Sequence, residues 1–432
     1  MAIELSNLTF TEQDDIVPLS GVEQILNTGV ANTLAGNDTI TGIGLLYESG
    51  SEYGLFNSGT FNTAEGNDRI TGTARLTGII NSGTFNTAEG NDTITGIGEF
   101  GLGFDNRSTF NTGEGNDIIT VNAAYGNGLD NTGTFNTGEG NDILTAGGRG
   151  VGLITSGTFN MGEGDDVINS GGRLRGIIIS GIFDTGDGND RIRGTSTTLF
   201  SGIGIYNESF SFNTGDGNDT IDGGGGDYDG IYNEGLINTG NGQDYIISRG
   251  ALRNYGGVFL GDGNDSITAN KDLPNRALEN FNIIETGEGN DIITSTGIIY
   301  NEGVINTGNG DDSIIANGGV YNNGGAINMG DGNDTLIANE GFESGPNSSG
   351  AVYLGNGQDY LKGFGSGDFY GGNSRDILQL TPGSYTVGRW GETVTFKKGS
   401  SLMITSEFEQ LIAGSSMYHI GGLTEGQTIV IA

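Results

Sequence analysis

The chain has 432 residues, of which 85 are glycine, 4 are proline and none is cysteine. Its 54 acidic residues against 17 lysines and arginines give a formal net charge of −37, which argues against a nucleic-acid partner because the phosphates would be repelled. The absence of cysteine excludes disulfides, zinc–thiolate sites and thiol catalysis, and no apolar run approaches the roughly 18 residues that a membrane-spanning helix needs.

Residues 1–30 lack the glycine-rich turn that marks most of the chain. Their apolar residues are Ile3, Leu5, Leu8, Phe10, Ile16, Val17 and Ile25. We expect an N-terminal cap over the repeats that follow, or a segment that pairs with the last coil of a second copy, because an uncovered coil leaves an open sheet edge. No basic stretch followed by an apolar stretch opens the chain, so an ordinary secretory signal is not expected.

A seven-residue pattern dominates residues 31–380, and its cleanest copy is Gly-Glu-Gly-Asn-Asp-Ile-Ile at 113–119. We call its second acidic position the repeat aspartate. Fourteen copies follow one another at intervals of 21–30 residues, most of them 24 or 25. The repeat aspartates are Asp38, Asp68, Asp92, Asp117, Asp142, Asp166, Asp190, Asp219, Asp244, Asp265, Asp291, Asp312, Asp334 and Asp359. A fixed period in this range is typical of a solenoid, in which each repeat is one coil stacked on the last.

Apolar residues recur in three registers of each copy, as Phe104, Phe110 and Ile119 do around 113–119. Inward and outward positions alternate, with Phe110 and Thr112 inward and Asn111 outward, which is the spacing of a strand. The predicted fold is an all-β, right-handed parallel β-solenoid, like a β-helix or β-roll. It has three short strands per coil, about 14 coils and small β caps. The apolar columns are interpreted as core.

Asparagines share a further register, which predicts a ladder of side-chain amides bonded from coil to coil at a second corner. They are Asn57, Asn81, Asn106, Asn131, Asn233, Asn254, Asn280, Asn301 and Asn323. The same alignment places Tyr321 in the core of its coil.

Two motif-like turns crowd together at 363–380, and the second carries Asp376 in the position of a repeat aspartate. From 381 to 432 the repeat is absent, and apolar runs at 385–387, 394–396, 402–405, 411–412 and 429–431 predict strands. The expected division is therefore an N-terminal cap or pairing segment at 1–30, a repeat solenoid at 31–380, and a C-terminal β cap at 381–432.

A second acidic residue stands three positions before most repeat aspartates, as Glu65 and Glu89 do. In a parallel stack each acid faces its copy about 5 Å away, and like charges stacked in this way are destabilising. We therefore expect two adjacent acid columns that require a cation. A solvated, solubilising acidic edge is the alternative.

The segment 112–120, Thr-Gly-Glu-Gly-Asn-Asp-Ile-Ile-Thr, resembles the calcium-binding nonapeptide of the RTX (haemolysin-type) repeat proteins. In that family the aspartate carboxylates and turn carbonyls of neighbouring coils bind Ca²⁺. Because each coil here has about 24 residues and one such corner, the resemblance implies multiple Ca²⁺ ions in one column. It covers about residues 34–380.

The ligands that this resemblance implies are the fourteen repeat aspartates, Asp376, and the turns around Gly113, Gly115, Gly138 and Gly140. The match is weaker where Ala64 and Ala88 replace a glycine and where Gln243 and Gln358 precede the repeat aspartate. It is also weaker at 34–38, which lacks the first acid. Residues 381–432 resemble, more faintly, the RTX region that carries an uncleaved type I secretion signal, which implies an extracellular or cell-surface protein.

Catalytic motifs are missing from the sequence: it has no Gly-x-Ser-x-Gly, His-Glu-x-x-His or Walker pattern. The single histidine, His419, has no evident partner. Arg75, Arg149 and Arg173 each follow a repeat aspartate by seven residues. They form either a basic patch for an acidic glycan or for the acidic edge of another subunit, or scattered solubilising charges.

The function expected from these observations is a non-enzymatic, secreted, Ca²⁺-stabilised structural protein of the cell surface or matrix: a surface-layer, sheath or filament subunit that polymerises with itself. One alternative is an adhesin or binding module for glycan, ice or another cell, which predicts a flat face of regular Thr or Asn. The outward residues Thr39, Thr93, Thr220 and Thr335 are too intermittent to favour ice. A polysaccharide lyase or hydrolase is the further alternative, and it rests on fold analogy alone.

Overall fold

The computed structural model describes residues 2–18, 23–44, 52–198, 201–225, 228–271, 276–345 and 350–431. These residues form an all-β parallel β-solenoid of about 14 turns with three sheets, which confirms the fold class predicted from the repeat period. The chain divides into two compact units, residues 1–237 and 238–432, and the boundary falls inside β28 (Leu236–Asn238). None of the described residues belongs to a helix with the length and apolar character to span a membrane.

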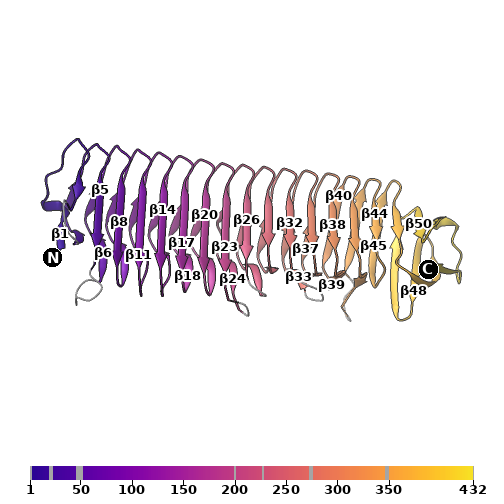
Figure 1. The fold of residues 1–432 in the computed structure, drawn as a ribbon. Helices are drawn as coiled ribbons and strands as arrows, with labels where there is room; N and C mark the ends of the chain where they lie inside the picture. Colours follow the sequence, from indigo (N-terminus) through magenta and orange to yellow (C-terminus); the bar gives the residue numbers. More distant parts are fainter. Residues whose placement is uncertain are drawn as a thin grey trace. The chain divides into compact units, whose positions relative to one another are not determined.

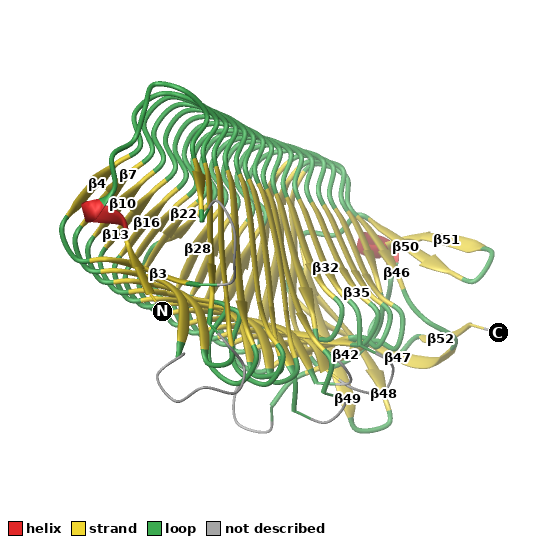
Figure 2. Ribbon diagram, turned by 60° about the vertical axis from the view of Figure 1, so that its left-hand side comes forward, coloured by secondary structure: helices red, strands yellow, loops and turns green. Residues whose placement is uncertain are grey.

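Each coil of the first unit contributes one strand to each of three sheets, numbered in the order in which a coil visits them (Figures 1 and 2). Sheet 1 contains β1 (Ala2–Glu4), β3 (Gln24–Asn27), β6 (Tyr53–Asn57), β9 (Thr77–Asn81), β12 (Phe104–Asn106), β15 (Leu129–Asn131), β18 (Val151–Thr155), β21 (Arg175–Ile179), β24 (Ile203–Asn207) and β27 (Asp229–Asn233). Sheet 2 contains β4 (Val30–Asn32), β7 (Thr60–Asn62), β10 (Thr84–Asn86), β13 (Thr109–Asn111), β16 (Thr134–Asn136), β19 (Thr158–Asn160), β22 (Ile182–Asp184) and β25 (Phe212–Asn213). Sheet 3 contains β2 (Ile16–Val17), β5 (Thr39–Ile43), β8 (Arg69–Ala74), β11 (Thr93–Gly98), β14 (Ile118–Ala123), β17 (Ile143–Gly148), β20 (Val167–Gly172), β23 (Arg191–Ser196) and β26 (Thr220–Gly224).

The second unit repeats this arrangement with shorter coils. Its sheet 1 contains β30 (Ala251–Asn254), β33 (Arg276–Asn280), β36 (Ile298–Asn301), β39 (Val320–Asn322) and β42 (Phe342–Glu343). Its sheet 2 contains β31 (Gly257–Phe259), β34 (Ile283–Glu285), β37 (Val304–Asn306), β40 (Ala326–Asp331), β43 (Ala351–Asn356), β45 (Gly367–Asn373) and β49 (Ser401–Ser406). Its sheet 3 contains β29 (Tyr245–Ser248), β32 (Ser266–Ala269), β35 (Ile292–Ser295), β38 (Ser313–Ala316), β41 (Thr335–Ala338), β44 (Tyr360–Lys362), β46 (Ile377–Gln379) and β50 (Gln410–Ala413).

The two chain ends depart from the regular coil. The 3₁₀ turns η1 (Leu5–Asn7) and η2 (Ile420–Gly422) are the helical elements of the described residues. Residues 383–431 supply antiparallel strands: β47 (Gly383–Trp390) pairs with both β48 (Thr393–Lys398) and β52 (Thr428–Ile431), and β51 (Ser416–His419) pairs with β50. Every strand predicted beyond residue 381 is present, and β51 is an additional one.

The core of the first unit is built around a single column of phenylalanines on sheet 2. Consecutive rings lie 4.7–5.3 Å apart between centroids, and each ring is fully buried. The column contains Phe61, Phe85, Phe110, Phe135, Phe159, Phe183 and Phe212. Burying each ring contributes roughly 1.5–3 kcal/mol, so the predicted apolar columns are indeed core.

One coil of the second unit corrects two sequence assignments. Val320, not Tyr321, is the core residue, and Asn301 donates its amide N–H to Oδ1 of Asn322, not of Asn323 (3.0 Å). Three residues separate the sheet 1 and sheet 2 strands of this coil, where the preceding coil has two. Counting backward from the repeat aspartate therefore misplaces both residues by one position.

Candidate functional site

The repeat aspartates lie at the corner that precedes each strand of sheet 3, and their side chains point inward. In the coil of β14, Asn116 and Ile118 are exposed whereas Asp117 and Ile119 are fully buried. All fourteen repeat aspartates and Asp376 are at most 2% exposed. The same period-two alternation that buries the isoleucine therefore buries a carboxylate in every coil.

Each buried carboxylate is tied to the coil before it. The backbone N–H of one repeat aspartate donates to Oδ1 of the next at 2.7–2.8 Å from Asp38 through to Asp219 in the first unit. In the second unit the same bond, 2.7–2.9 Å long, runs from Asp244 through to Asp376. These charge-assisted bonds fix the register of neighbouring coils.

The second carboxylate oxygen, Oδ2, is buried without a hydrogen-bond partner in most coils. This holds for Asp38, Asp68, Asp92, Asp117, Asp142, Asp166 and Asp190 in the first unit and for Asp265, Asp291, Asp312, Asp334, Asp359 and Asp376 in the second. A threonine five residues earlier lies near many of these carboxylates and lowers their pKa, as Thr87 does for Asp92, although its hydroxyl is placed to donate to a carbonyl oxygen of the next coil, that of Thr112 for Thr87 (3.1 Å). An unpaired buried charge is costly, so this oxygen marks a position where a partner is needed.

Burial is the largest cause of a raised pKa along the column. It raises the pKa of Asp92 and Asp142 to about 7 and that of Asp166 to about 8. In the second unit it raises the pKa of Asp312 to about 7 and that of Asp359 to about 6. At neutral pH, burial in the folded chain therefore disfavours the ionised form of these carboxyl groups. A cation bound at the oxygens without a partner would offset the free-energy cost of ionising them.

The two glycines of each turn are required by backbone conformation and by space. Gly138 and Gly140 have φ of +105° and +134°, and a Cβ on Gly138 would lie 1.8 Å from the carbonyl oxygen of Gly113. Ala64 and Ala88 occupy the first glycine position with φ of +63° and +69°, which is strained for alanine. The carbonyl oxygens of Gly113, Gly115, Gly138 and Gly140 accept no hydrogen bond from any described residue, so they remain available as ligands.

The two acid columns expected from the sequence are not alike. The acids three positions earlier, such as Glu114 and Glu139, are exposed, whereas the repeat aspartates are buried. The turn separates the two columns, because Glu114 lies between Gly113 and Gly115, which have positive φ, whereas Asp117 lies where the chain enters β14. The exposed glutamates therefore match the solvated edge, and only the buried column carries an unmet need for a cation.

Sequence reasoning missed two acids in the same register at the chain ends. The backbone N–H of Asp15 donates to Oδ1 of Asp38 (2.8 Å), and that of Asp376 donates to Oε2 of Glu409 (2.8 Å). Neither turn contains the Gly-x-Gly signature, which hid them. The signal that remains is an apolar residue two positions later, Val17 or Leu411.

A fit test for the implied Ca²⁺ rests on the donor set. Turns such as 113–117 and 138–142 offer only oxygen: a buried Oδ2 without a partner and glycine carbonyls without a donor, which are the hard ligands that Ca²⁺ prefers. In the second unit the first glycine carbonyl of the turn is less free, since those of Gly261, Gly287 and Gly308 accept a backbone N–H from the next coil. Among the described residues, no group of three or more His, Cys, Asp and Glu side chains comes together. That is expected when two neighbouring coils supply two aspartates, so carbonyls must complete the shell. The residues present fit Ca²⁺.

Arg75, Arg149 and His419, which the sequence also singles out, have structural partners. The Arg75 guanidinium lies 5.3 Å from the Phe100 ring centroid, and that of Arg149 lies 5.3 Å from the Tyr125 ring centroid. Phe100 and Tyr125 stack on each other at 5.1 Å, so these arginines cover the two ends of an aromatic stack. Nδ1 of His419 accepts a hydrogen bond from the backbone N–H of Gly421 (3.1 Å) and caps η2.

No protein-family model matches this chain, and its sequence matches no curated protein. Among solved structures, it is similar to the crystal structure of a hyperactive, Ca²⁺-dependent, β-helical antifreeze protein from an Antarctic bacterium. The likeness has 20% sequence identity and a TM-score of 0.41, and it covers 82% of this chain and 84% of the other. Similarity at this level does not support an argument about function, so the function of the present chain is inferred from its own geometry.

Proposed function

We propose that this chain is a Ca²⁺-stabilised structural β-solenoid of the RTX type that serves at the cell surface or in the extracellular matrix, as a surface-layer, sheath or filament subunit. The observation that carries the proposal is the buried aspartate column, in which one carboxylate oxygen per coil has no partner. Repeat aspartates such as Asp117 and Asp142 would hold the ions, with turn carbonyls such as those of Gly113 and Gly115. The bound ions would neutralise the column and link coil to coil.

The proposal includes export before folding. In a Ca²⁺-poor cytosol the buried column opposes coil formation, and outside the cell ion binding supplies the missing partner. Export by a type I route through residues 381–432 would keep the chain unfolded until it meets Ca²⁺. No enzymatic activity is part of the proposal.

Self-association is supported by the N-terminal end of the first unit. The strands β1 and β2 pair on one side only among the described residues. A hollow of about 560 Å³ beside them is lined by Leu8, Phe10 and Ile16, among others. Unpaired strand edges next to apolar surface favour addition of another chain. Electron microscopy should show filaments or sheets with Ca²⁺ that dissolve in chelator. Single particles at every concentration would remove polymerisation from the proposal.

The metal role is tested by Asp142→Asn. Asparagine keeps an oxygen for the N–H of Asp117 but removes the buried charge. We expect the variant to melt at or above the wild-type temperature in chelator, and below it in Ca²⁺, by circular dichroism. Glu139→Gln, an exposed acid of the same turn, is the matched control and should leave the Ca²⁺ effect unchanged. A variant that is more stable than wild type in both conditions would show that the column holds no Ca²⁺.

A further inference from the structure

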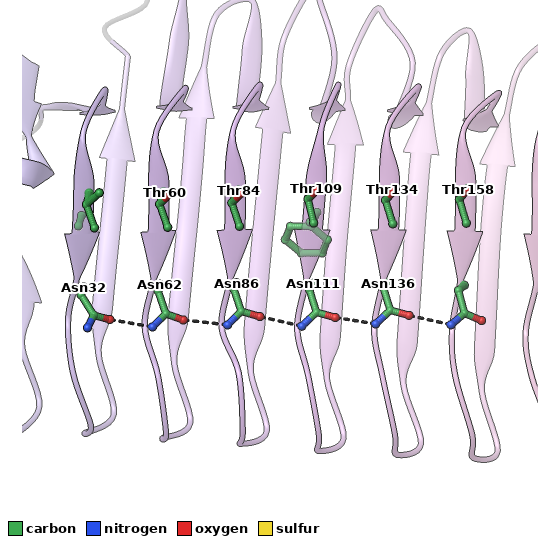
Figure 3. Close-up of a pocket in the computed structure, with 14 residues that line it drawn as sticks. Asn32, Thr60, Asn62, Thr84, Asn86, Thr109, Asn111, Thr134, Asn136 and Thr158 are labelled. Carbon is green, nitrogen blue, oxygen red and sulfur yellow. Dashed lines mark hydrogen bonds between the residues drawn. The ribbon is translucent and has the colours of Figure 1, made fainter.

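Sheet 2 of the first unit presents a regular polar face outward, opposite the phenylalanine column. Its strands repeat Thr-Phe-Asn five times, and the registered pairing stacks like residue on like. The threonine row is Thr60, Thr84, Thr109, Thr134 and Thr158 (Figure 3). The asparagine row is Asn62, Asn86, Asn111, Asn136 and Asn160. We call the two rows the Thr/Asn face. Together with Asn32, its rows border a shallow groove of about 780 Å³.

The face is ordered before any ligand arrives. Each asparagine donates an amide N–H to Oδ1 of the asparagine on the preceding coil, at 2.5–2.8 Å (Figure 3). The five threonine hydroxyls make no hydrogen bond to any described residue, and their β-branched side chains are stiff at χ1. The second N–H of each amide and all five hydroxyls thus point to solvent from fixed positions. Fixed donors and acceptors lower the entropic cost of binding.

The threonines are not needed by the coil itself. The equivalent positions on sheet 2 of the second unit are Gly257, Ile283, Val304, Ala326 and Ala351, and those coils form without threonine. In the first unit the row ends where Ile182 pairs with Thr158 and Asp184 pairs with Asn160. A polar row that is confined to five consecutive coils points to a use other than folding.

The groove carries no charge, although the chain has a net charge of −37. None of its lining residues is acidic or basic. Its floor is the strand backbone, since the Phe110 ring points into the core, and its walls are hydroxyls on one side and amides on the other. Strand geometry sets the two rows about 6.6 Å apart and successive pairs about 4.8 Å apart, so the five pairs span roughly 19 Å.

We propose that the Thr/Asn face binds a linear, neutral polysaccharide along the stack of coils. Such a chain offers hydroxyls that donate and accept along both edges, which matches the hydroxyl row and the amide row of the face. The coil spacing is of the order of one pyranose residue, so successive sugars meet successive Thr–Asn pairs. The absence of charge from the groove excludes acidic glycans as the preferred ligand. This inference goes beyond the proposed scaffold function and assigns it an attachment surface.

The test uses the full-length chain in Ca²⁺ and a panel of neutral polysaccharides: cellulose, chitin, xylan, mannan and β-glucan. Alginate and polygalacturonate serve as acidic comparators. We expect binding to at least one neutral polysaccharide, measured by co-sedimentation or affinity electrophoresis and insensitive to NaCl. The triple variant Thr84→Val, Thr109→Val, Thr134→Val keeps the side-chain shape and removes three hydroxyls. It should bind at least about tenfold more weakly.

A matched control lies on sheet 3 of the same unit, where Thr71, Thr95 and Thr120 also stack outward. Their triple substitution to valine should leave binding unchanged, and circular dichroism should show both triple variants folded. Absence of binding to every neutral polysaccharide, or equal loss in both variants, would overturn the assignment. The assignment would also be overturned if the protein were retained in growing ice through this face and bound no glycan. If chelator lowers neither the melting temperature nor glycan binding, the calcium proposal fails and this one stands.

Discussion

A carboxylate in every coil is placed where an apolar residue would ordinarily be. The repeat aspartates are as buried as the isoleucines two positions later, and one oxygen of each is used to hold the neighbouring coil. The other oxygen has no hydrogen-bond partner, and burial raises the pKa of the carboxyl group, as at Asp142. On the proposed function, each aspartate therefore lowers the stability of the folded chain when no cation is bound and raises it when a cation binds. This is what a protein that folds after export would require.

Asp166 has the most raised of these pKa values for a local reason. Its coil has Met161 five residues earlier, where the preceding coil has Thr137, whose hydroxyl lowers the pKa of Asp142. We predict that Met161→Thr lowers the pKa of Asp166 from about 8 toward the value of about 7 at Asp142. Carboxyl ¹³C NMR in chelator, assigned with Asp166→Asn, measures the shift. Met329→Thr in the other unit is the parallel case at Asp334. An unchanged titration would mean that the methionine does not set this value.

Side chains at the strand ends add polar bonds between coils to the backbone ladders of the three sheets. On the inner side, Asn106 donates its amide to Oδ1 of Asn131 and to the carbonyl oxygen of Thr134, both at 2.8 Å. It also accepts from the amide of Asn81 (2.9 Å). The result is a fully buried amide that joins three consecutive coils, and a solenoid whose coils contact only their neighbours depends on such joints.

Asn106→Ala should therefore cost about 2–4 kcal/mol in the free energy of unfolding, because it leaves a buried carbonyl and a buried amide without partners. Asn111→Ala, on the exposed ladder five residues away, is the matched control and should cost less than about 1 kcal/mol. Urea unfolding at fixed Ca²⁺ measures both. Equal costs would show that burial of the inner ladder adds nothing to its bonds.

The sequence correctly predicts those positions that lie a constant number of residues from the repeat aspartate of their coil. The core register of sheet 1 and the amide ladder follow from the repeat period, and both assignments fail at 320–323, where one extra corner residue breaks the count. The depth of the aspartates did not follow from the sequence, since acids are expected to be exposed. The Thr/Asn face was not predicted, because the outward threonines identified from the sequence, such as Thr93, lie on the strand after the turn and not on the Thr-Phe-Asn strand before it. The terminal turns at Asp15 and Glu409 lack glycine, and an apolar residue two positions later is too weak a signal without the hydrogen bonds.

For the molecule as a whole, the proposed function requires the column to couple stability to both pH and Ca²⁺. Burial raises the pKa of its carboxyl groups above the ordinary 3.8, to about 6 at Asp68, about 7 at Asp376 and about 8 at Asp166. Between about pH 4 and about pH 8 the folded chain therefore binds more protons than the unfolded chain does. The free energy of unfolding without cation must then fall as pH rises from about 4 to about 8. A cation competes with those protons, so its effect has the opposite dependence.

We predict that in chelator the melting temperature falls by on the order of 10 °C between about pH 5 and pH 8, because each unit of raised pKa is worth about 1.4 kcal/mol. Added Ca²⁺ should restore the loss at pH 8 and add little at pH 5, where the column is protonated. Circular dichroism melts at both pH values test this. The double variant Asp117→Asn, Asp142→Asn should show a shallower fall, which separates the buried column from the exposed glutamates. A melting temperature in chelator that rises toward pH 8 would contradict the neutral, buried column. A Ca²⁺ effect of equal size at both pH values would mean that the ions bind elsewhere on the acidic surface.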